Sequence, residues 1–426
     1  MALWVLLTVL VASAWPAVHS GIRGVLLISC LAASGWAAVT VLRFRREGYS
    51  ADKSIWAAAG IVLLLGIYGL NPTHQWKDGV GLIPVHSVPG LPGTAFRSGT
   101  GRTLLLTFAI LSVFNLARHL GPRSLRSLSA AAAVGGAAMA VRVLWQRLMP
   151  QPFPVFEYTG SFVNENHFAV FANLLLPVVL AAGYRQKTRA LQTGRISNPS
   201  GLFYISGALL AAALIASGSR AGRAGLVLIG AAWILRRMIL HRRHPFLSGA
   251  WIRWTFFLWV SFALIALAAL ILGLSREWPH VAVLQGELSF RLNMLSDTVR
   301  MWKSHPGWGT GPGTFSTVIS YYQSEAMRGH PWIHAHCEPL QFLAEYGVWG
   351  TAILAGLAGW ALTSWPKKKS LSTEIPSFGE LERFGFALGL LVLALHCLVD
   401  FPLRIPLIAL MAATWTGVWN RNGGSP

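Results

Sequence analysis

The sequence is poor in charged residues, above all in acidic ones. Only 12% of its 426 residues are charged, with 15 Asp and Glu against 35 Lys and Arg, whereas a soluble domain carries about 25% charged residues. Hydrophobic residues make up 54% of the chain, and the mean hydropathy is +0.52. A soluble fold cannot bury so much apolar surface, but a lipid bilayer can accommodate it. The composition therefore excludes a soluble globular protein and predicts an integral membrane protein.

Cysteine is also scarce. Cys30, Cys337 and Cys397 lie far apart, so the sequence has neither a CxxC metal knuckle nor a disulfide framework. The net charge of +20 would by itself suggest a nucleic-acid partner. In a membrane protein, however, Lys and Arg collect in the cytoplasmic loops, and the 19 Trp residues suit the membrane–water boundary. We expect membrane lipids and no nucleic acid among the partners.

Twelve apolar stretches are long enough, or nearly so, to cross about 30 Å of hydrocarbon. They cover residues 3–18, 24–42, 54–70, 103–120, 128–144, 168–183, 202–217, 224–240, 254–274, 342–362, 384–399 and 405–418. The first lacks the basic start of a signal peptide, although residues 17–20 faintly resemble a cleavage site, so we expect this helix to be retained. The sequence predicts an all-α polytopic protein that forms one integral membrane domain over residues 1–426.

The loop charges orient these spans. With the N-terminus in the cytoplasm, the inside loops hold most of the 35 Lys and Arg residues, and the outside segments hold most of the 15 Asp and Glu residues. This pattern predicts that both termini are cytoplasmic. Three long segments then lie outside, at 71–102, 145–167 and 275–341. Apolar residues recur at helical spacing within 290–302, so we expect the third segment, between spans nine and ten, to contain helices on the membrane surface. Long loops carry function more often than short ones, so we expect the catalytic residues there.

Two polar motifs stand at the outer ends of spans. Asn164 and Asn166 precede the sixth span in SFVNENH, where they fit either a helix cap or hydrogen bonds to a sugar. Arg220 and Arg223 lie in SGSRAGR, a short outside turn where two arginines are unexpected. Such residues either extend toward lipid headgroups or bind phosphate, whose oxygens match the guanidinium fork. The sequence leaves both alternatives open.

The long outside loop holds two more motifs. Arg291 has no nearby acid except Glu287, which makes it a candidate ligand for an anion, whereas we interpret Asp297 and Arg300 as an ordinary surface pair. Residues 306–315 (PGWGTGPGTF) are rich in glycine but lack the Lys-Ser/Thr ending of a nucleotide P-loop. We therefore expect a tight turn in which backbone segments pack closely.

A His-x-His pair opens the segment before the tenth span. Residues 334–338 (HAHCE) suggest zinc, interfacial histidines or a general base. No compact third and fourth ligands are evident, so we expect no metal. At the outer end of the eleventh span, Asp400 and Arg404 are spaced to pair with each other, which predicts a structural role for both.

In this order, these segments resemble the O-antigen ligase and polymerase superfamily of bacterial membrane proteins. The matching segments are 162–169 (FVNENHFA), 219–222 (SRAG), Arg291 with Trp302, 306–315 and 336–347 (HCEPLQFLAEYG). The resemblance covers about residues 161–404. No single motif is specific, but their order and their outside placement together are.

The resemblance implies a fold like that of the GT-C glycosyltransferases and an active site on the periplasmic face of the bacterial inner membrane. It implies transfer of a saccharide from undecaprenyl pyrophosphate to lipid A–core, as in ligases, or to a growing glycan, as in polymerases; the residue set favours the ligase. The family's two essential arginines and histidine correspond to Arg220, Arg291 and His336, which we predict to be catalytic. Cys337 stands where family members often carry Asn or Ser. The reaction is expected to invert the anomeric centre without a cofactor or metal. The residues expected to bind substrate are Arg220, Arg291, Asn164, Asn166, Arg223 and Glu345.

Two other classes of function stay open. A transporter or flippase usually places ionisable residues or broken helices at mid-membrane. Here the middles of the spans are nearly free of charge, and the unusual polar residues gather at one face. This distribution favours an enzyme. A structural envelope protein that holds a polysaccharide assembly together is the third alternative.

Overall fold

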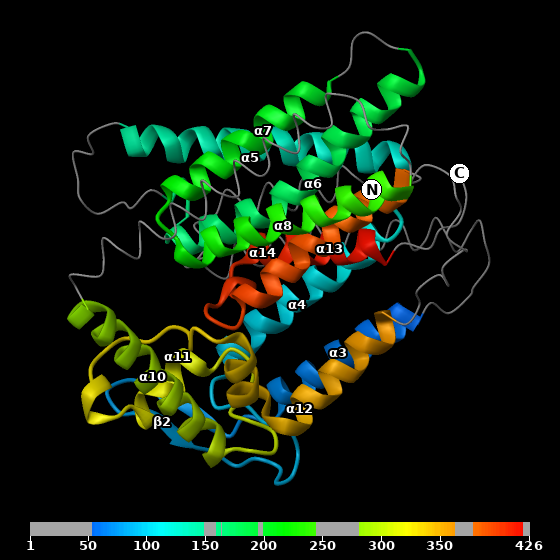
Figure 1. Ribbon diagram of the computed structural model, residues 1–426. Helices are drawn as coiled ribbons and strands as arrows, with labels where there is room; N and C mark the ends of the chain where they lie inside the picture. Colours follow the sequence, from blue (N-terminus) through cyan, green and yellow to red (C-terminus); the bar gives the residue numbers. More distant parts are fainter. Residues whose placement is uncertain are drawn as a thin grey trace.

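The computed structural model describes residues 53–148, 159–162, 164–194, 199–243, 281–362 and 378–420 (Figure 1). This part of the chain is mostly helical. The α-helices are α3 (Lys53–Leu70), α4 (Arg97–Ala117), α5 (Pro122–Leu148), α6 (Glu165–Gln192), α7 (Ser200–Ala216), α8 (Arg220–Arg243), α10 (Val281–Ser304), α11 (Phe315–Val318), α12 (Glu338–Leu362), α13 (Phe378–His396) and α14 (Pro406–Trp419). Three 3-10 turns lie between these helices, η3 (Ile319–Tyr322), η4 (Glu325–Met327) and η5 (Pro402–Arg404).

The expected spans coincide with helices wherever the structure describes them. The expected spans at 3–18, 24–42 and 254–274 lie outside the described residues. Among the described helices, α3, α4, α5, α6 and α12 are long and apolar enough to cross a membrane, and α7 and α14 are shorter apolar helices. These features support a mostly helical membrane protein. The number of spans and their orientation stay predictions.

Helix α6 forms the centre of the main helix bundle. It packs against α5, α7, α8, α13 and α14 and is buried along nearly its whole apolar stretch. Its sequence is apolar on every side, as expected for a helix surrounded by others. Helix α13 approaches it closely, because a Cβ atom at Gly385 would lie only 2.7 Å from the carbonyl oxygen of Pro177. Glycine at this position lets the two backbones meet.

Helices α3 and α12 lie side by side, apart from the bundle around α6 (Figure 1). Helix α4 joins the two groups by packing against both α3 and α14. Helix α12 is broken at Gly347, whose φ of 64° is non-helical. A small second core links α10, α11 and the start of α12 through Met301, Phe315 and Ala344. The described part of the segment before α12 thus folds as a packed unit on this helix.

A β-hairpin departs from the all-α expectation. Strands β1 (His74–Lys77) and β2 (Gly81–Pro84) pair antiparallel, and the backbone N–H of Leu82 donates to the hydroxyl of Tyr321 at 3.1 Å. Strands of four residues are too short to give a periodic pattern. The Asp78-Gly79 turn was the available signal, because such pairs favour tight hairpin turns and Gly79 has a φ of 77°.

Helix α10 confirms the helix expected at 290–302 and extends it at both ends. The expectation of an ordinary surface pair at Asp297 and Arg300 is wrong for the acid. Asp297 is buried, pairs with Arg300, and accepts hydrogen bonds from the backbone N–H and the hydroxyl of Ser324 at 3.1 and 3.3 Å. Asp297 therefore fixes the segment around η4 to α10.

Candidate active site

His336 and Asp400 form a polar pair beside the start of α12. His336 lies just before α12, and Asp400 lies between α13 and η5. His336 Nδ1 is 3.1 Å from Asp400 Oδ1, with the histidine side chain 30% exposed and the aspartate buried. His396 Nε2 is farther from the other carboxylate oxygen, at 3.9 Å. The pair joins two segments that the sequence reading had treated separately.

The charge state of Asp400 follows from its surroundings. Burial alone would raise the pKa of Asp400, but the hydrogen bond from His336 and the charges of His336 and His167 outweigh it and hold the pKa below its usual range. Asp400 is therefore a carboxylate near neutral pH and accepts from Nδ1–H. This fixes the tautomer in which Nε2 of His336 is the proton acceptor.

The backbone at His336 is strained. Among the described residues, His336 is the only non-glycine residue with a positive φ, at 50°. A side chain held in this left-handed region costs about 1–3 kcal/mol and persists only where the surrounding contacts fix it. Such strain is concentrated at functional sites, so it makes His336 a stronger candidate for a functional residue.

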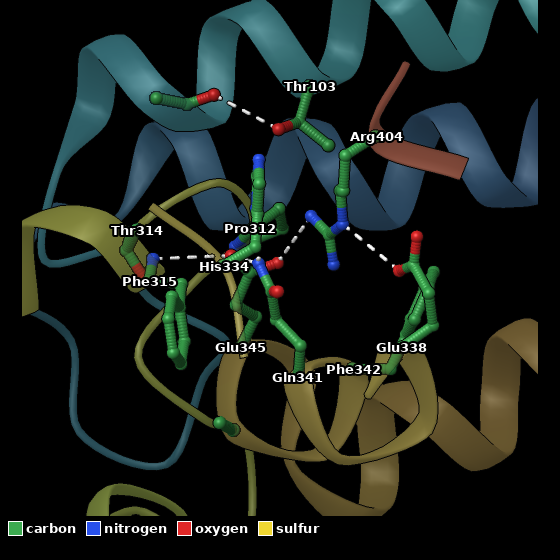
Figure 2. Close-up of polar contacts among 12 residues, drawn as sticks. Thr103, Pro312, Thr314, Phe315, His334, Glu338, Gln341, Phe342, Glu345 and Arg404 are labelled. Carbon is green, nitrogen blue, oxygen red and sulfur yellow. Dashed lines mark hydrogen bonds and ion pairs between the residues drawn. The ribbon is translucent and has the colours of Figure 1, made fainter. Parts of the chain in front are cut away.

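Arg404 supplies the contacts that hold this segment (Figure 2). Its Nε donates to Glu338 Oε2 at 3.1 Å, and its Nη1 donates to Glu345 Oε2 at 2.9 Å. Burial would lower the pKa of Arg404, but the two carboxylates outweigh it and raise the pKa further. The expected pairing of Asp400 with Arg404 is therefore wrong. Each residue instead bonds to a group on the segment that runs from His336 into α12.

The contacts continue from Glu345 to the histidine segment. Glu345 Oε1 accepts from the backbone N–H of Phe315 and from Gln341 Nε2, at 3.2 and 3.3 Å (Figure 2). Gln341 Oε1 in turn accepts from the backbone N–H of Ala335, at 3.0 Å. We call Arg404, Glu338, Glu345 and Gln341 the Arg404 network. It fixes the backbone directly beside His336.

The glycine-rich segment packs against the break in α12. The backbone N–H groups of Thr310 and Gly311 donate to the carbonyl groups of Ala344 and Glu345, at 3.1 and 2.8 Å. Gly309 has a φ of 69°, and a Cβ atom there would lie 2.4 Å from the carbonyl oxygen of Glu345. The structure confirms the close backbone turn. These two amides are engaged within the protein and are not free to bind a phosphate.

A hydrogen bond joins the motif at the start of α6 to the motif at the start of α8. Asn164 caps α6 by accepting from the backbone N–H of Asn166 at 2.7 Å. The side-chain oxygen of Asn166 accepts from the hydroxyl of Ser219 at 2.6 Å. Ser219 directly precedes Arg220, the first residue of α8. The structure thus supports the cap alternative for Asn164 and joins Asn166 to Ser219, the residue that precedes Arg220.

The three predicted arginines differ in their surroundings. Arg220 and Arg291 are exposed, at the start of α8 and on α10. Arg223 is half-buried, and its Nε and Nη2 donate to the carbonyl oxygen of Ile215 near the end of α7, at 3.3 and 3.1 Å. Arg223 therefore ties α7 to α8. The roles of Arg220 and Arg291 in binding substrate stay predictions.

Sequence reasoning missed two features of the site. It recorded Asp400 only as a helix-end residue, because no spacing in the sequence pairs it with His336. It also missed Phe401, whose ring contacts His336, His334 and His167. Within the described part of the chain, no group of three or more His, Cys, Asp and Glu residues is arranged to hold a metal ion. The zinc interpretation of the His-x-His pair thus gains no support there.

One of the comparisons with known proteins finds a match to part of this chain. Residues 205–355 match the family model described as O-antigen ligase, a segment that contains Arg220, Arg291, His336 and Glu345. No curated protein matches the chain. At the level of the family, the match indicates a glycosyltransferase-type enzyme, and the apolar helices indicate a membrane protein. The match over residues 205–355 confirms the resemblance to the O-antigen ligase and polymerase superfamily.

Proposed function

We propose that this protein transfers a saccharide from an undecaprenyl-pyrophosphate carrier to a hydroxyl group of an acceptor, on the periplasmic face of the bacterial inner membrane. The observation that carries the proposal is His336, held by the buried carboxylate of Asp400 at 3.1 Å. Asp400 orients the imidazole in the manner of the acid in a catalytic triad. A sugar hydroxyl is a weak nucleophile, so a positioned base is the group that such a reaction needs.

The proposed reaction is a single displacement. The acceptor oxygen forms a bond to the anomeric carbon as the bond from that carbon to the pyrophosphate oxygen breaks. The electron pair leaves with undecaprenyl pyrophosphate, and the acceptor proton passes to Nε2 of His336. Attack from the side opposite the leaving group inverts the anomeric centre. Neither a metal nor a cofactor takes part in this scheme.

Arg220 and Arg291 are proposed to bind the pyrophosphate. Negative charge grows on its oxygens as the bond breaks, and a guanidinium group neutralises it with two parallel hydrogen bonds. Losing one such donor typically reduces the rate by about 10²–10³. The residues that directly precede the two arginines make contacts with segments that lead to His167 and His336. Arg220 follows Ser219, which bonds Asn166 beside His167, and Arg291 follows Phe290, whose ring packs against Trp332 at 4.6 Å.

The other residues predicted to bind substrate are proposed to act in two different ways. Asn164 and Asn166 are proposed to contribute to sugar binding beside Arg220, although Asn164 also caps α6. Arg223 and the buried Glu345 each hold a backbone segment of the site in place. We propose that their effect on substrate is exerted through these segments, because their polar atoms are engaged within the protein.

The test uses purified protein in lipid nanodiscs with an undecaprenyl-pyrophosphate-linked oligosaccharide extracted from the organism's own membranes. Release of undecaprenyl pyrophosphate and the size of the sugar product are followed in EDTA, with and without lipid A–core. Release with one transfer step to lipid A–core supports a ligase, and a growing ladder without that acceptor supports a polymerase. Folded protein that releases no carrier contradicts the proposal and favours transport or a structural role. Loss of release in EDTA contradicts metal independence alone.

The proposed orientation needs a separate test. Reporter domains that are active only in the cytoplasm or only in the periplasm are fused after residue 426 and inserted near residue 328. We expect cytoplasmic activity for the first fusion and periplasmic activity for the second. The reverse result would place the His336 site on the cytoplasmic face, away from the proposed donor and acceptor.

A further inference from the structure

The ring of Phe401 is surrounded by three imidazole rings. The ring centroids of His167, His334 and His336 lie 5.1, 4.4 and 4.7 Å from that of Phe401. His167 belongs to the first turn of α6, the other two histidines precede α12, and Phe401 follows α13. Three imidazole rings, from two distant parts of the chain, therefore meet at one aromatic side chain from a third part. The proposed mechanism uses only one of them.

Phe401 and Asp400 act on His336 from two directions. The backbone N–H of Phe401 donates to Asp400 Oδ1 at 2.9 Å, the same oxygen that lies 3.1 Å from His336 Nδ1. The carboxylate and the phenyl ring are therefore fixed relative to each other. The imidazole of His336 meets the phenyl ring nearly edge-on, at an interplanar angle of 81°. This is one of the arrangements that aromatic rings prefer.

The other two histidines support the ring without competing for Asp400. The ring of His334 packs on Phe401 in a tilted arrangement, at an interplanar angle of 37°, and its Nδ1 accepts from Gln341 Nε2 at 3.3 Å. Burial, with the charge of Arg404 next in importance, lowers the pKa of His334 to about 3, so it is neutral at physiological pH. His167 is buried, and neither of its ring nitrogens has a hydrogen-bond partner among the described residues. Both rings therefore act on Phe401 through packing.

We infer that Phe401 is a positioning residue for the transfer reaction, holding the imidazole of His336 so that Nδ1 meets Asp400 and Nε2 faces the acceptor hydroxyl. The inference rests on the proposed function. His336 needs such a support because its backbone is strained and its side chain is 30% exposed. One hydrogen bond to Asp400 leaves the ring free to tilt about that bond. An edge-on aromatic contact removes this freedom, and misplacing a catalytic group by about 1 Å can reduce a rate about 10²-fold.

The test compares three substitutions in the nanodisc transfer assay. Phe401→Leu removes the ring, Phe401→Tyr keeps it, and Phe386→Leu truncates a buried phenylalanine of α13 that packs against Trp415, away from the histidines. We expect Phe401→Leu to lower kcat by about 10–100-fold with little change in the KM for the acceptor, because the ring orients the base and does not bind substrate. Phe401→Tyr should restore most of kcat. Phe386→Leu should lower the melting temperature but leave kcat near that of the wild type.

A double substitution separates positioning from space filling. If Phe401 acts through His336 and Asp400, adding Phe401→Leu to Asp400→Asn should reduce kcat little beyond Asp400→Asn alone, because the base is already misplaced. Multiplicative losses, or equal losses for Phe401→Leu and Phe401→Tyr, would overturn the inference. Should the leucine variant fail to fold, Phe401→Met takes its place, since methionine fills similar space without a ring.

The activity of the wild-type protein separates failure of the proposed function from failure of the proposed role of Phe401. Wild-type protein that releases no carrier overturns the proposed function and this inference together. Active wild type with full kcat in Phe401→Leu overturns the inference alone. Active wild type with a low kcat in Phe401→Leu and recovery in Phe401→Tyr supports both.

Discussion

The bundle around α6 is held together by apolar packing, whereas the Arg404 network is held together by hydrogen bonds between charged groups. In the bundle, apolar side chains fill the space between helices, and glycine at position 385 lets α13 approach the backbone of α6. In the Arg404 network, one arginine that is largely enclosed pairs with two buried glutamates, and these accept hydrogen bonds from the backbone N–H groups of Leu403 and Phe315. Apolar packing has no fixed direction and tolerates exchanges of similar volume. Hydrogen-bonded charges have fixed directions, so they determine where a backbone segment lies.

A buried ion pair also lies within the described part of the bundle, which makes the comparison sharper. Arg185 of α6 and Glu382 of α13 approach to 2.5 Å, and both are largely buried. This pair joins two helices that already pack along their length. Arg404 instead joins a turn to the start of a helix, next to the strained His336. A buried ion pair is weak evidence for stability in itself. The locations of the two sets of ion pairs indicate that only those of Arg404 set the geometry of a functional group, the imidazole of His336.

Replacing the proposed base should have the largest effect. His336→Asn keeps a residue that tolerates the left-handed backbone, while it removes the proton acceptor. We expect kcat to fall by about 10²–10⁴-fold, the usual range for a general base, with the melting temperature near that of the wild type. Release of undecaprenyl pyrophosphate in nanodiscs measures the rate. Normal turnover in a folded His336→Asn protein would remove His336 from the mechanism.

Removing one arginine from each region tests the comparison directly. Arg404→Met leaves Glu338 and Glu345 buried without their partner, and Arg185→Met does the same to Glu382. Breaking a buried pair in this way costs about 3–5 kcal/mol. Both variants should unfold at lower temperature or lower denaturant, but only Arg404→Met should also lose transfer activity. Equal loss of activity in both variants would show that the Arg404 network has no special role in positioning.

The arginines that are proposed to bind pyrophosphate should show a smaller effect. Arg291→Gln removes an exposed guanidinium from α10, and we expect kcat/KM to fall by about 10²–10³-fold. Lys303→Gln, at an exposed position on the same helix, removes the same charge away from the proposed site. It should leave the rate nearly unchanged. If both variants lose activity equally, Arg291 acts only through the general charge of the surface.

Much of the fold was predictable because apolar length is a local property. The runs that became α3 through α8 and α12 through α14 are visible without knowledge of any partner, and the apolar spacing at 290–302 indicated α10. The hairpin was missed because its strands have four residues each, too few to show alternation. Its folding depends instead on distant support, including the hydrogen bond between Leu82 and Tyr321.

The site was predictable only in part. The motifs and the family resemblance pointed to His336, Arg220 and Arg291, but not to the contacts that hold them. The spacing of Asp400 and Arg404 suggested a local pair, as on a helix. In the structure α13 ends at His396 and a 3-10 turn begins at Pro402, so the two side chains bond to different residues. Such partners are set by tertiary packing, which sequence spacing does not encode.

The smallest predicted effect is a pH dependence of stability that arises from the segment beside the Arg404 network. The lowered pKa of His334, about 3, compares with about 6.5 in an unfolded chain. Below about pH 6.5, His334 binds a proton in the unfolded state but not in the folded state. The contribution of His334 to the free energy of unfolding is therefore at its full value above that pH. It declines by about 1.4 kcal/mol for each unit of further acidification. Melting temperatures from pH 7.5 to 4.5 measure the slope. His334→Phe keeps a ring against Phe401 but cannot bind the proton, so the melting temperature of this variant should fall less steeply on acidification. Burial also lowers the pKa values of His74 and His305, and these residues account for part of the slope that remains in the variant. Equal slopes would mean that His334 is not held neutral in the folded protein, and that its contact with Phe401 is looser than the structure indicates.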